Sequence, residues 1–291
     1  CRLIHGEGDS LPGLIVDFYN GVAVVQCHSI GMYNSIVFIT EALKNAFGKQ
    51  LKAIYSKSSD TLPARTDVVD GYVFGKCTTP HQALEHGVKI NIDWINGQKT
   101  GFFLDQRENR FLLGQLAANK DVLNCYCYTG GFSIYAIKGG AATVESVDSS
   151  ALAIEQYKEN LQSNGLDAEK HVTSVSDVPT FLRQQTKSYD IIVVDPPAFA
   201  KSIKSKHTAT QAYKRLNIAG LKALAPKGIL FTFSCSQVID DVLFYNTVAA
   251  AAIETGRTIR VLHKLTQGPD HPTNIYHPEG HYLKGLVLYV E

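Results

Sequence analysis

The chain has 291 residues, which is long for one domain of typical size and sufficient for two domains with separate cores. Lys and Arg number 28, Asp and Glu number 27, and the formal net charge is therefore only +1, while 45% of the residues are hydrophobic. This composition excludes a wholly disordered chain. It also gives no overall basic charge of the kind typical of nucleic-acid-binding proteins, and no stretch of about 18 apolar residues suggests a membrane span.

The cysteine pattern indicates a reducing compartment. Six cysteines stand at positions 1, 27, 77, 125, 127 and 235, without a CxxC pair and without the spacing of a zinc site. We therefore expect free thiols in a cytoplasmic protein, and no metal site. The chain begins with Cys1 instead of Met and holds a single Met, so we also expect sequence upstream of Cys1.

The first 97 residues predict a small α+β domain. Strand-forming runs 14–19 and 22–26 are joined by Asn20-Gly21, which is a strong hairpin signal. A helix is expected over 33–46, because its apolar residues recur on one face and Gly48 follows it. Further strands are expected over 51–56 and 88–94.

Residues 98–291 predict a doubly wound parallel sheet. After a helix over 106–119, strand patterns (122–124, 142–147, 171–174, 190–194, 229–233, 258–264) alternate with helical ones (150–163, 209–223, 238–254), and a last strand covers 283–290. This alternation is typical of βαβ units with a Rossmann-like arrangement. Ligands of such sheets bind at the carboxyl ends of the strands, so the residues that follow each strand are the candidate site residues.

The first of these strand ends predicts a nucleoside site. Residues 124–133 read as a strand end, a tight Gly130-Gly131 turn and a helix start, without the three spaced glycines of a dinucleotide fingerprint. Asp148 ends the next strand, where a carboxylate can accept hydrogen bonds from ribose hydroxyls, and Asp177 follows the third, where an adenine edge can be met. Asp148 and Asp177 could equally cap the helices that follow them. Together the three strand ends favour S-adenosylmethionine, a nucleoside without a diphosphate.

The fourth and fifth strands end in groups that suit methyl transfer to a base. Asp195-Pro196-Pro197 follows four apolar residues, and two prolines make a rigid loop. Cys235 lies between two serines at the end of the fifth strand and ahead of a helix, which favours a lowered thiol pKa. A buried structural thiol is the alternative.

The chemistry distinguishes carbon from nitrogen methylation. Carbon 5 of cytosine is a poor nucleophile until a thiolate adds at carbon 6, whereas an exocyclic nitrogen needs no thiol. A carboxyl group beside the base can stabilise the adduct through nitrogen 3. In amino-methylating enzymes an aromatic residue follows the prolines directly; here Ala198 takes that place and Phe199 comes next. Cys235 is thus the discriminating residue.

These motifs together resemble one family, and the resemblance covers nearly the whole chain. The sequence resembles the bacterial 23S ribosomal RNA 5-methylcytosine methyltransferases, which are class I S-adenosylmethionine-dependent enzymes. The matching segments are 85–87, 97–107, 124 with 128–132, 195–197, 234–236, 271–272, 278–280 and 282–285. Residues 97–107 with Ser234-Cys235-Ser236 are the most specific of these, whereas Asp-Pro-Pro alone is not specific.

The resemblance implies roles for individual residues. Cys235 would be the nucleophile and Asp195 its catalytic partner; Tyr128, Thr129 and Gly130 would line the methionine part of the cofactor, Asp148 the ribose and Asp177 the adenine. The full implied cofactor set is Asp105, Asn124, Cys127, Tyr128, Thr129, Gly130, Phe132, Asp148, Ser149, Asp177 and Asp195. Asn124 departs from the family, where an acid is common. The resemblance also implies ribosomal RNA as partner and a PUA-type RNA-binding domain ahead of Cys1.

Several alternatives stay open at this point. An RNA guanine or adenine N-methyltransferase would share Asp195-Pro196-Pro197 but would have no use for Cys235. A non-catalytic RNA-binding assembly factor could retain the fold, and a homodimer is one alternative for the quaternary structure. Lys201, Lys204, Lys206 and His207 could contact phosphates or could form a solvated loop.

Overall fold

The computed structural model describes residues 1–62, 68–168, 171–200 and 202–291, and it divides the chain into two compact units. The first unit comprises Cys1–Arg107 and Gly268–Gly280, and the second comprises Glu108–Gln267 and His281–Glu291. No pattern in the sequence had assigned 268–280 to the first unit. Among the described residues, no helix is long and apolar enough to cross a membrane.

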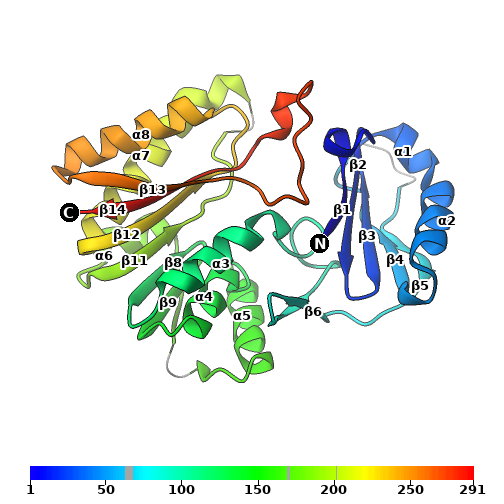
Figure 1. Ribbon diagram of the computed structural model, residues 1–291, viewed down its shortest axis with the longest axis horizontal. Helices are drawn as coiled ribbons and strands as arrows, with labels where there is room; N and C mark the ends of the chain where they lie inside the picture. The colour runs from blue at the N-terminus through cyan, green and yellow to red at the C-terminus, as the bar shows by residue number, and fades with distance from the viewer. Residues whose placement is uncertain (63–67, 169–170, 201) are drawn as a thin grey trace. The chain divides into compact units, whose positions relative to one another are not determined.

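The first unit is a five-stranded sheet with helices on one face and a separate hairpin (Figure 1). The sheet order is β1-β2-β3-β4-β5, and its strands and helices are β1 (Arg2–His5), β2 (Leu14–Tyr19), β3 (Val22–Cys27), α1 (Ile30–Asn34), α2 (Ile36–Phe47), β4 (Ala53–Ser56) and β5 (Gly71–Gly75). The hairpin consists of β6 (His81–Glu85) and β7 (Val88–Ile92). Leu43 of α2 packs with Val16, Val25 and Ile54 of the sheet, which forms this unit's core.

The second unit contains the doubly wound sheet, in the order β10-β9-β8-β11-β12-β14-β13. Its strands are β8 (Asp121–Cys125), β9 (Thr143–Asp148), β10 (Val172–Val175), β11 (Tyr189–Val194), β12 (Leu224–Ser234), β13 (Ile259–Leu265) and β14 (Lys284–Val290). β8 to β12 are parallel, and β14 is antiparallel to both of its neighbours. The Rossmann-like sheet predicted from the alternating pattern is confirmed.

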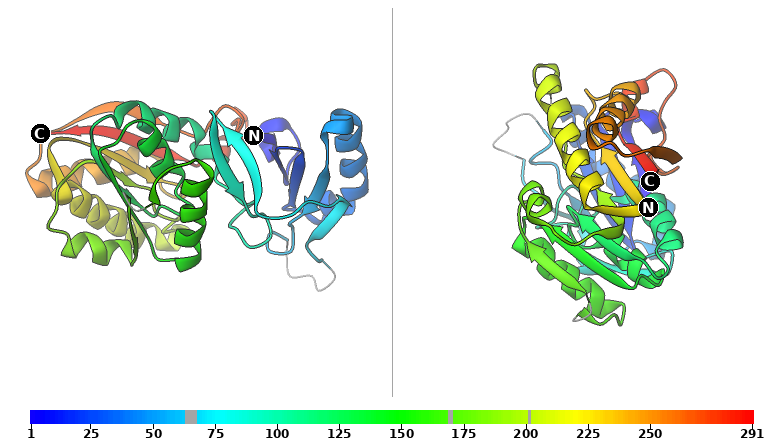
Figure 2. Two further views of the ribbon diagram at one scale, coloured as in Figure 1. Left: turned by 90° about the horizontal axis from the view of Figure 1, so that it is seen from below. Right: turned by 90° about the vertical axis from the view of Figure 1, so that its left-hand side faces the viewer.

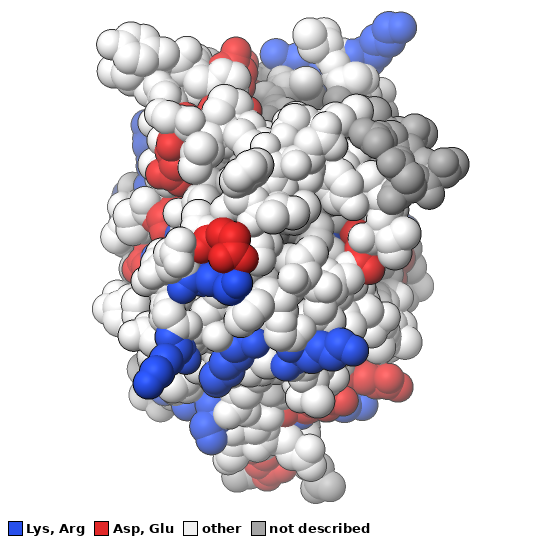
Figure 3. Space-filling model, turned by 90° about the vertical axis from the view of Figure 1, so that its right-hand side faces the viewer, with Lys and Arg blue, Asp and Glu red and all other residues white. Residues whose placement is uncertain are grey.

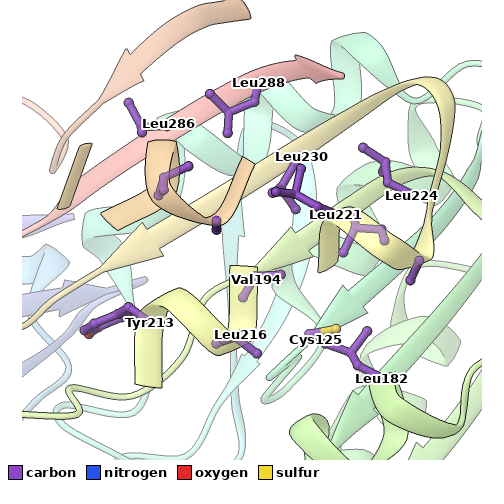
Figure 4. Packing of buried hydrophobic residues seen from close by; sticks show 14 of the residues in the cluster. Cys125, Leu182, Val194, Tyr213, Leu216, Leu221, Leu224, Leu230, Leu286 and Leu288 are labelled. Carbon is purple, nitrogen blue, oxygen red and sulfur yellow. The ribbon is translucent and has the colours of Figure 1, made fainter. Parts of the chain in front are cut away.

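Helices cover both faces of this sheet (Figures 1 and 2). They are α3 (Arg107–Leu116), α4 (Gly131–Lys138), α5 (Ala151–Ser163), α6 (Val178–Gln184), α7 (Lys206–Ala223) and α8 (Asp241–Thr255). Apolar residues of α6, α7 and α8 pack on one face, where Leu216 and Leu221 meet Val194, Leu230 and Leu288 (Figure 4). On the other face α3 and α4 contribute Leu113, Phe132 and Ala136. The buried central strands of the sheet fix the strand ends that carry the site.

Most predicted elements are present, with differences at their ends. The single helix expected over 33–46 is two helices that meet at Ser35, whose hydroxyl donates to the Gly31 carbonyl. The last predicted helix begins at Asp241 rather than 238, because Asp240 caps it by accepting the Leu243 N–H at 2.8 Å. Strands β1, β5 and β6 were not expected, and α6 was expected only as the helix that Asp177 could cap. β5 begins and ends with glycine, which weakens any strand signal.

Candidate cofactor and catalytic site

The candidate site lies at the carboxyl edge of the second unit's sheet. β8 pairs with β9 on one side and with β11 on the other, so the strand order reverses between β8 and β11. Such a reversal separates the loops that follow the two strands and leaves a crevice for a ligand. Cys125, Asp148 and Val194 are the last residues of β8, β9 and β11, so the loops after these strands start at this edge.

The loop after β8 has an unusual backbone. Tyr126, Tyr128 and Gly130 have φ angles of 59°, 49° and 80°, all in the left-handed region. Two non-glycine residues in this region cost free energy, which surrounding contacts must offset. The Cys127 N–H donates to the Val147 carbonyl at 3.0 Å, and the Gly130 N–H donates to the Cys127 carbonyl at 2.8 Å. The strand next to it therefore holds the loop in this conformation.

Gly130 is required at its position by space as well as by φ. A Cβ atom there would lie 1.8 Å from Cδ2 and 2.4 Å from Cε2 of Tyr157. Tyr157 is fully buried in α5, so its ring has little room to move away. The turn before α4 is thus packed directly on an aromatic ring.

Asp148 connects two loops of the site. One carboxylate oxygen accepts the Tyr128 N–H at 2.9 Å, and the other accepts the Ser150 N–H at 2.9 Å. Each carboxylate oxygen has two lone pairs, so the group keeps acceptor capacity for hydroxyls of a bound ribose. Asp148 does not cap α5, because the Ser150 side chain does so by accepting the Ala153 N–H. Ser149 is exposed between them.

Thr129 lies in the loop between β8 and α4. Its side chain is buried, and its hydroxyl has no hydrogen-bond partner among the described residues. Its carbonyl accepts the Asn160 side-chain N–H at 3.0 Å, which fixes the loop from α5. The Thr129 hydroxyl is one of several buried polar side-chain atoms that have no partner among the described residues. Together with the Asp148 carboxylate, this loop fits a nucleoside with a positively charged sulfonium, as in S-adenosylmethionine.

Asp177 caps helix α6. Its carboxylate accepts the Thr180 N–H at 3.0 Å and the Thr180 hydroxyl at 2.7 Å, and the residue is exposed. This is the capping role that the sequence had left open as an alternative. A contact from Asp177 to an adenine stays a prediction.

Three other predicted cofactor residues lie beneath the loop. Asn124 is buried, and its amide donates to the Ser133 hydroxyl at 2.8 Å, which in turn lies 2.7 Å from the Ser146 hydroxyl. Cys127 is buried, and Phe132 packs in the core with its ring 5.7 Å from that of Phe233. Their positions support the loop from inside, and direct cofactor contacts from these residues stay predictions.

Asp105 belongs to the first unit. It lies in the 3-10 turn Leu104–Gln106, and its carbonyl accepts the Gly268 N–H at 3.2 Å. Nearby, Arg107 donates to the Asp270 carboxylate at 2.8 Å. The segment 97–107 is thus tied to the returning segment 268–280, and its contact with a cofactor stays a prediction.

The predicted catalytic pair lies on neighbouring strands. Asp195 directly follows β11, and Cys235 directly follows β12, with which β11 pairs in parallel. The Cys235 thiol donates to the Pro196 carbonyl with an S···O distance of 3.8 Å and is partly exposed. The structure therefore brings Cys235 against the Asp195-Pro196-Pro197 loop.

Three further residues hold this pair of loops. The Ser236 hydroxyl lies 2.9 Å from the Tyr213 hydroxyl of α7 and accepts the Ala200 N–H at 3.4 Å. The Lys284 ammonium donates to the Ser236 carbonyl at 2.8 Å. Ser236 and Lys284 lie in segments that carried the family resemblance, without a role assigned to either residue. Tyr213 carried no signal, because it reads as one more apolar residue on a helix face.

The described basic residues after the proline loop are exposed or half-exposed. Lys201 lies outside the described residues. Lys204 and His207 are exposed, and Lys206 lies 3.7 Å from the Asp240 carboxylate. Phosphate contacts from this segment stay a prediction.

Comparisons with known proteins agree with this geometry. A family model described as S-adenosylmethionine-dependent methyltransferase matches residues 1–280. The chain is 41% identical over 296 residues to ribosomal RNA large subunit methyltransferase I of Aeromonas salmonicida, and 41% identical over 301 residues to the protein of that name in Shewanella amazonensis. Each alignment covers 99% of this chain and 74% of the relative.

Solved structures show the same fold. A protein from Streptococcus mutans described as a SAM-dependent methyltransferase superimposes with a TM-score of 0.86 at 26% identity, over 99% of this chain and 74% of that one. A methyltransferase solved in complex with SAH superimposes with a TM-score of 0.87 at 26% identity, with the same coverage. The fold is therefore that of class I methyltransferases, its cofactor is S-adenosylmethionine, and the chain belongs to the S-adenosylmethionine-dependent methyltransferase family that includes the ribosomal RNA large subunit methyltransferase I proteins.

Proposed function

We propose that this protein transfers a methyl group from S-adenosylmethionine to carbon 5 of a cytosine in large-subunit ribosomal RNA, with Cys235 as the nucleophile. The observation that carries the proposal is the position of the Cys235 thiol, 3.8 Å from the Pro196 carbonyl at the strand edge that Asp195 shares. A thiol beside an Asp-Pro-Pro loop serves no purpose in methylation of an exocyclic nitrogen, but it is needed for methylation at carbon 5.

The proposed reaction uses the two side chains in sequence. The Cys235 thiolate adds its electron pair to carbon 6 of the base, and carbon 5 becomes nucleophilic. The Asp195 carboxyl group, in its protonated form, donates a hydrogen bond to nitrogen 3 and stabilises the negative charge of the adduct. The bound cofactor supplies an electrophilic methyl group, which carbon 5 accepts. Loss of the carbon 5 proton to a base then restores the double bond, and the carbon–sulfur bond breaks to release the thiolate.

The surroundings of Phe199 favour this reaction over N-methylation. In amino-methylating enzymes an aromatic ring next to the prolines stacks on the extruded base, and Phe199 is the nearest such ring here. It packs instead against Tyr213, with ring centroids 4.7 Å apart, and against the core of the second unit. A ring used in this way is not presented to a base, so the N-methyltransferase alternative loses its stacking group.

Ribosomal RNA is proposed as the substrate on two grounds. The relatives at 41% identity are named as methyltransferases of large-subunit ribosomal RNA. In addition, Lys and Arg side chains form a band on one face of the first unit (Figure 3). The near-zero net charge of the chain therefore hides a locally basic surface. An enzyme of ribosomal RNA with six free cysteines fits the bacterial cytoplasm, where we place it.

Four lysines of the first unit lie in or next to α2, β4 and β5. Lys52 and Lys76 flank the paired residues Ala53 and Gly75 of neighbouring strands, and both are exposed. Lys49 is exposed in the turn after α2, and the Lys44 ammonium lies 5.4 Å from the Phe74 ring centroid and 2.7 Å from the Glu41 carboxylate. We propose that these four lysines contact phosphates of the RNA.

The test uses RNA that contains 5-fluorocytosine. Fluorine at carbon 5 cannot leave as a proton, so the covalent adduct accumulates and survives a denaturing gel. We expect the adduct with the unchanged protein and none with Cys235→Ala, while Cys77→Ala, which removes another free thiol, behaves as the unchanged protein. Full methyl transfer by Cys235→Ala, or an N-methylated base as product, would overturn the proposal.

A further inference from the structure

Lys284 is a buried cation beside the end of β12, the strand that Cys235 follows. It is the first residue of β14 and pairs with Ser234 of β12, one position before Cys235. Only 3% of the residue is exposed. Its ammonium donates to the carbonyl oxygens of Ser236 at 2.8 Å and Tyr282 at 2.7 Å. Both partners are neutral, and among the described residues no carboxylate lies within ion-pair distance of Lys284.

This arrangement is costly without a compensating negative charge. Burying an ammonium that is hydrogen-bonded only to neutral groups carries a desolvation penalty, which hydrogen bonds offset in part. Burial lowers the pKa of Lys284, and the negative charges of Asp241, of the Cys235 thiolate and of Asp240 act in the opposite direction. The two carboxylates are already engaged, since Asp241 lies 3.0 Å from His281 and Asp240 lies 3.7 Å from Lys206.

We infer that Lys284 is a positioning residue for Cys235: its ammonium holds the backbone that follows the thiol and stabilises the thiolate form. The inference rests on the proposed role of Cys235 as nucleophile. Charge interactions are mutual, so a thiolate that stabilises the ammonium is stabilised by it to the same extent. The hydrogen bond to Ser236 adds a geometric role, because Ser236 is also tied to Tyr213.

Three neighbouring charged groups and one neighbouring phenol do not replace this cation. Asp240 and Asp241 at the start of α8 are carboxylates, which disfavour a thiolate. Tyr213 of α7 is neutral at pH 7, since burial raises the pKa of its hydroxyl. Lys206 is half-exposed and forms its ion pair with Asp240, so water screens its charge.

A purely structural role for Lys284 predicts a different result. The ammonium would then close the ends of β12 and β14 by hydrogen bonding alone, and any donor would serve. Lys284→Gln separates the two roles, because an amide keeps N–H donors for the carbonyls and removes the charge. Lys284→Arg keeps the charge.

The experiment follows alkylation of Cys235 by iodoacetamide as a function of pH, with mass spectrometry of the peptide that contains Cys235. In the unchanged protein we expect a midpoint below the value of about 8.5 typical of a free thiol. Lys284→Gln should raise the midpoint by about one pKa unit, which is about a tenfold loss of the alkylation rate at pH 7. Lys284→Arg should stay near the unchanged protein. The control Lys206→Gln, which removes an exposed cation nearby, should move the midpoint by less than about 0.3 unit.

Two outcomes would overturn the inference: a midpoint in the unchanged protein at or above about 8.5, or the same midpoint in Lys284→Gln and the unchanged protein. If Lys284→Gln does not fold, the midpoint of the unchanged protein decides. This readout needs neither cofactor nor RNA. A shifted midpoint together with full methyl transfer by Cys235→Ala would therefore reject the proposed function and leave the inference about the thiolate intact.

Discussion

Substitution of Gly130 by alanine tests the architecture of the cofactor loop. The new Cβ would lie 1.8 Å from Cδ2 of Tyr157, far inside van der Waals contact, and the residue would keep a φ of about 80°. The left-handed conformation costs alanine about 1 kcal/mol. Overpacking against a fully buried ring adds about 1–3 kcal/mol. We therefore expect a loss of about 2–4 kcal/mol in the free energy of unfolding.

Gly256→Ala is a matched control in the same unit. Gly256 follows α8 with a φ of 66°, but nothing lies within 4 Å of its added Cβ. It carries the conformational cost alone, about 1 kcal/mol. The difference between the two variants in urea-induced unfolding thus isolates the contact between Gly130 and Tyr157.

Cofactor affinity gives a second readout of the same substitution. Relief of the clash must displace either the ring or the loop, and a displaced loop moves Thr129 and the Tyr128 N–H that donates to Asp148. We expect the affinity for S-adenosylhomocysteine, measured by calorimetry, to fall at least about tenfold in Gly130→Ala and to stay unchanged in Gly256→Ala. Equal stability losses in the two variants with unchanged affinities would refute this reasoning.

Three further predictions address the site, the first unit and the RNA surface. Asp148→Asn should weaken cofactor binding about tenfold or more, because an amide nitrogen must then face the Tyr128 or Ser150 N–H. Asp177→Asn should leave the stability of the protein unchanged, because asparagine caps helices equally well. A loss of stability in Asp177→Asn would contradict the capping role. Burial, together with the charges of Arg2 and His271, lowers the pKa of His5 to about 4. The unfolded state therefore binds the proton first, and the free energy of unfolding should fall as the pH drops from about 6.5 to 4. His5→Gln should flatten this pH dependence in urea titrations, and an unaltered slope would contradict the prediction. Replacing both Lys52 and Lys76 by glutamine should weaken RNA binding and should reduce the slope of log Kd against log salt concentration by about one to two. An unchanged slope would show that neither lysine contacts a phosphate.

The sequence predicted best those features that depend on local pattern. Buried parallel strands are continuous apolar runs, so 190–194 and 229–233 were recognised and their ends gave Asp195 and Cys235. The edge of the sheet follows from topology, and this sufficed to place Asp148 and Cys235 at one edge. Short edge strands such as β5, with glycine at both ends, have no comparable pattern and were missed.

Features that depend on contacts distant in the chain could not be predicted. The assignment of 268–280 to the first unit rests on contacts such as the 2.8 Å pair of Arg107 with Asp270, which are separated by 163 positions. Likewise, a glycine turn indicates a positive φ but does not reveal the Tyr157 ring beneath it. Asp177 illustrates the remaining ambiguity: one residue type serves both capping and ligand binding, and only its contacts distinguish the two.

The positions of Asp148 and Lys284 suggest why one sheet edge can serve both cofactor and base. Under the proposed function Asp148, at the end of β9, would place a carboxylate at the ribose of a cofactor that carries a positive charge, and under the further inference Lys284, at the start of β14, would place an ammonium near the thiol. These strands are separated in the sheet by β8, β11 and β12, so opposite charges lie on opposite sides of the Asp195 loop. Under these two proposals, a cationic methyl donor and an anionic nucleophile would each have a charge of opposite sign on its own side of the sheet edge. Exchange of these two charges would disfavour both the cationic cofactor and the thiolate. The Cys235 titration and the Asp148 variant therefore test the two halves of this charge arrangement.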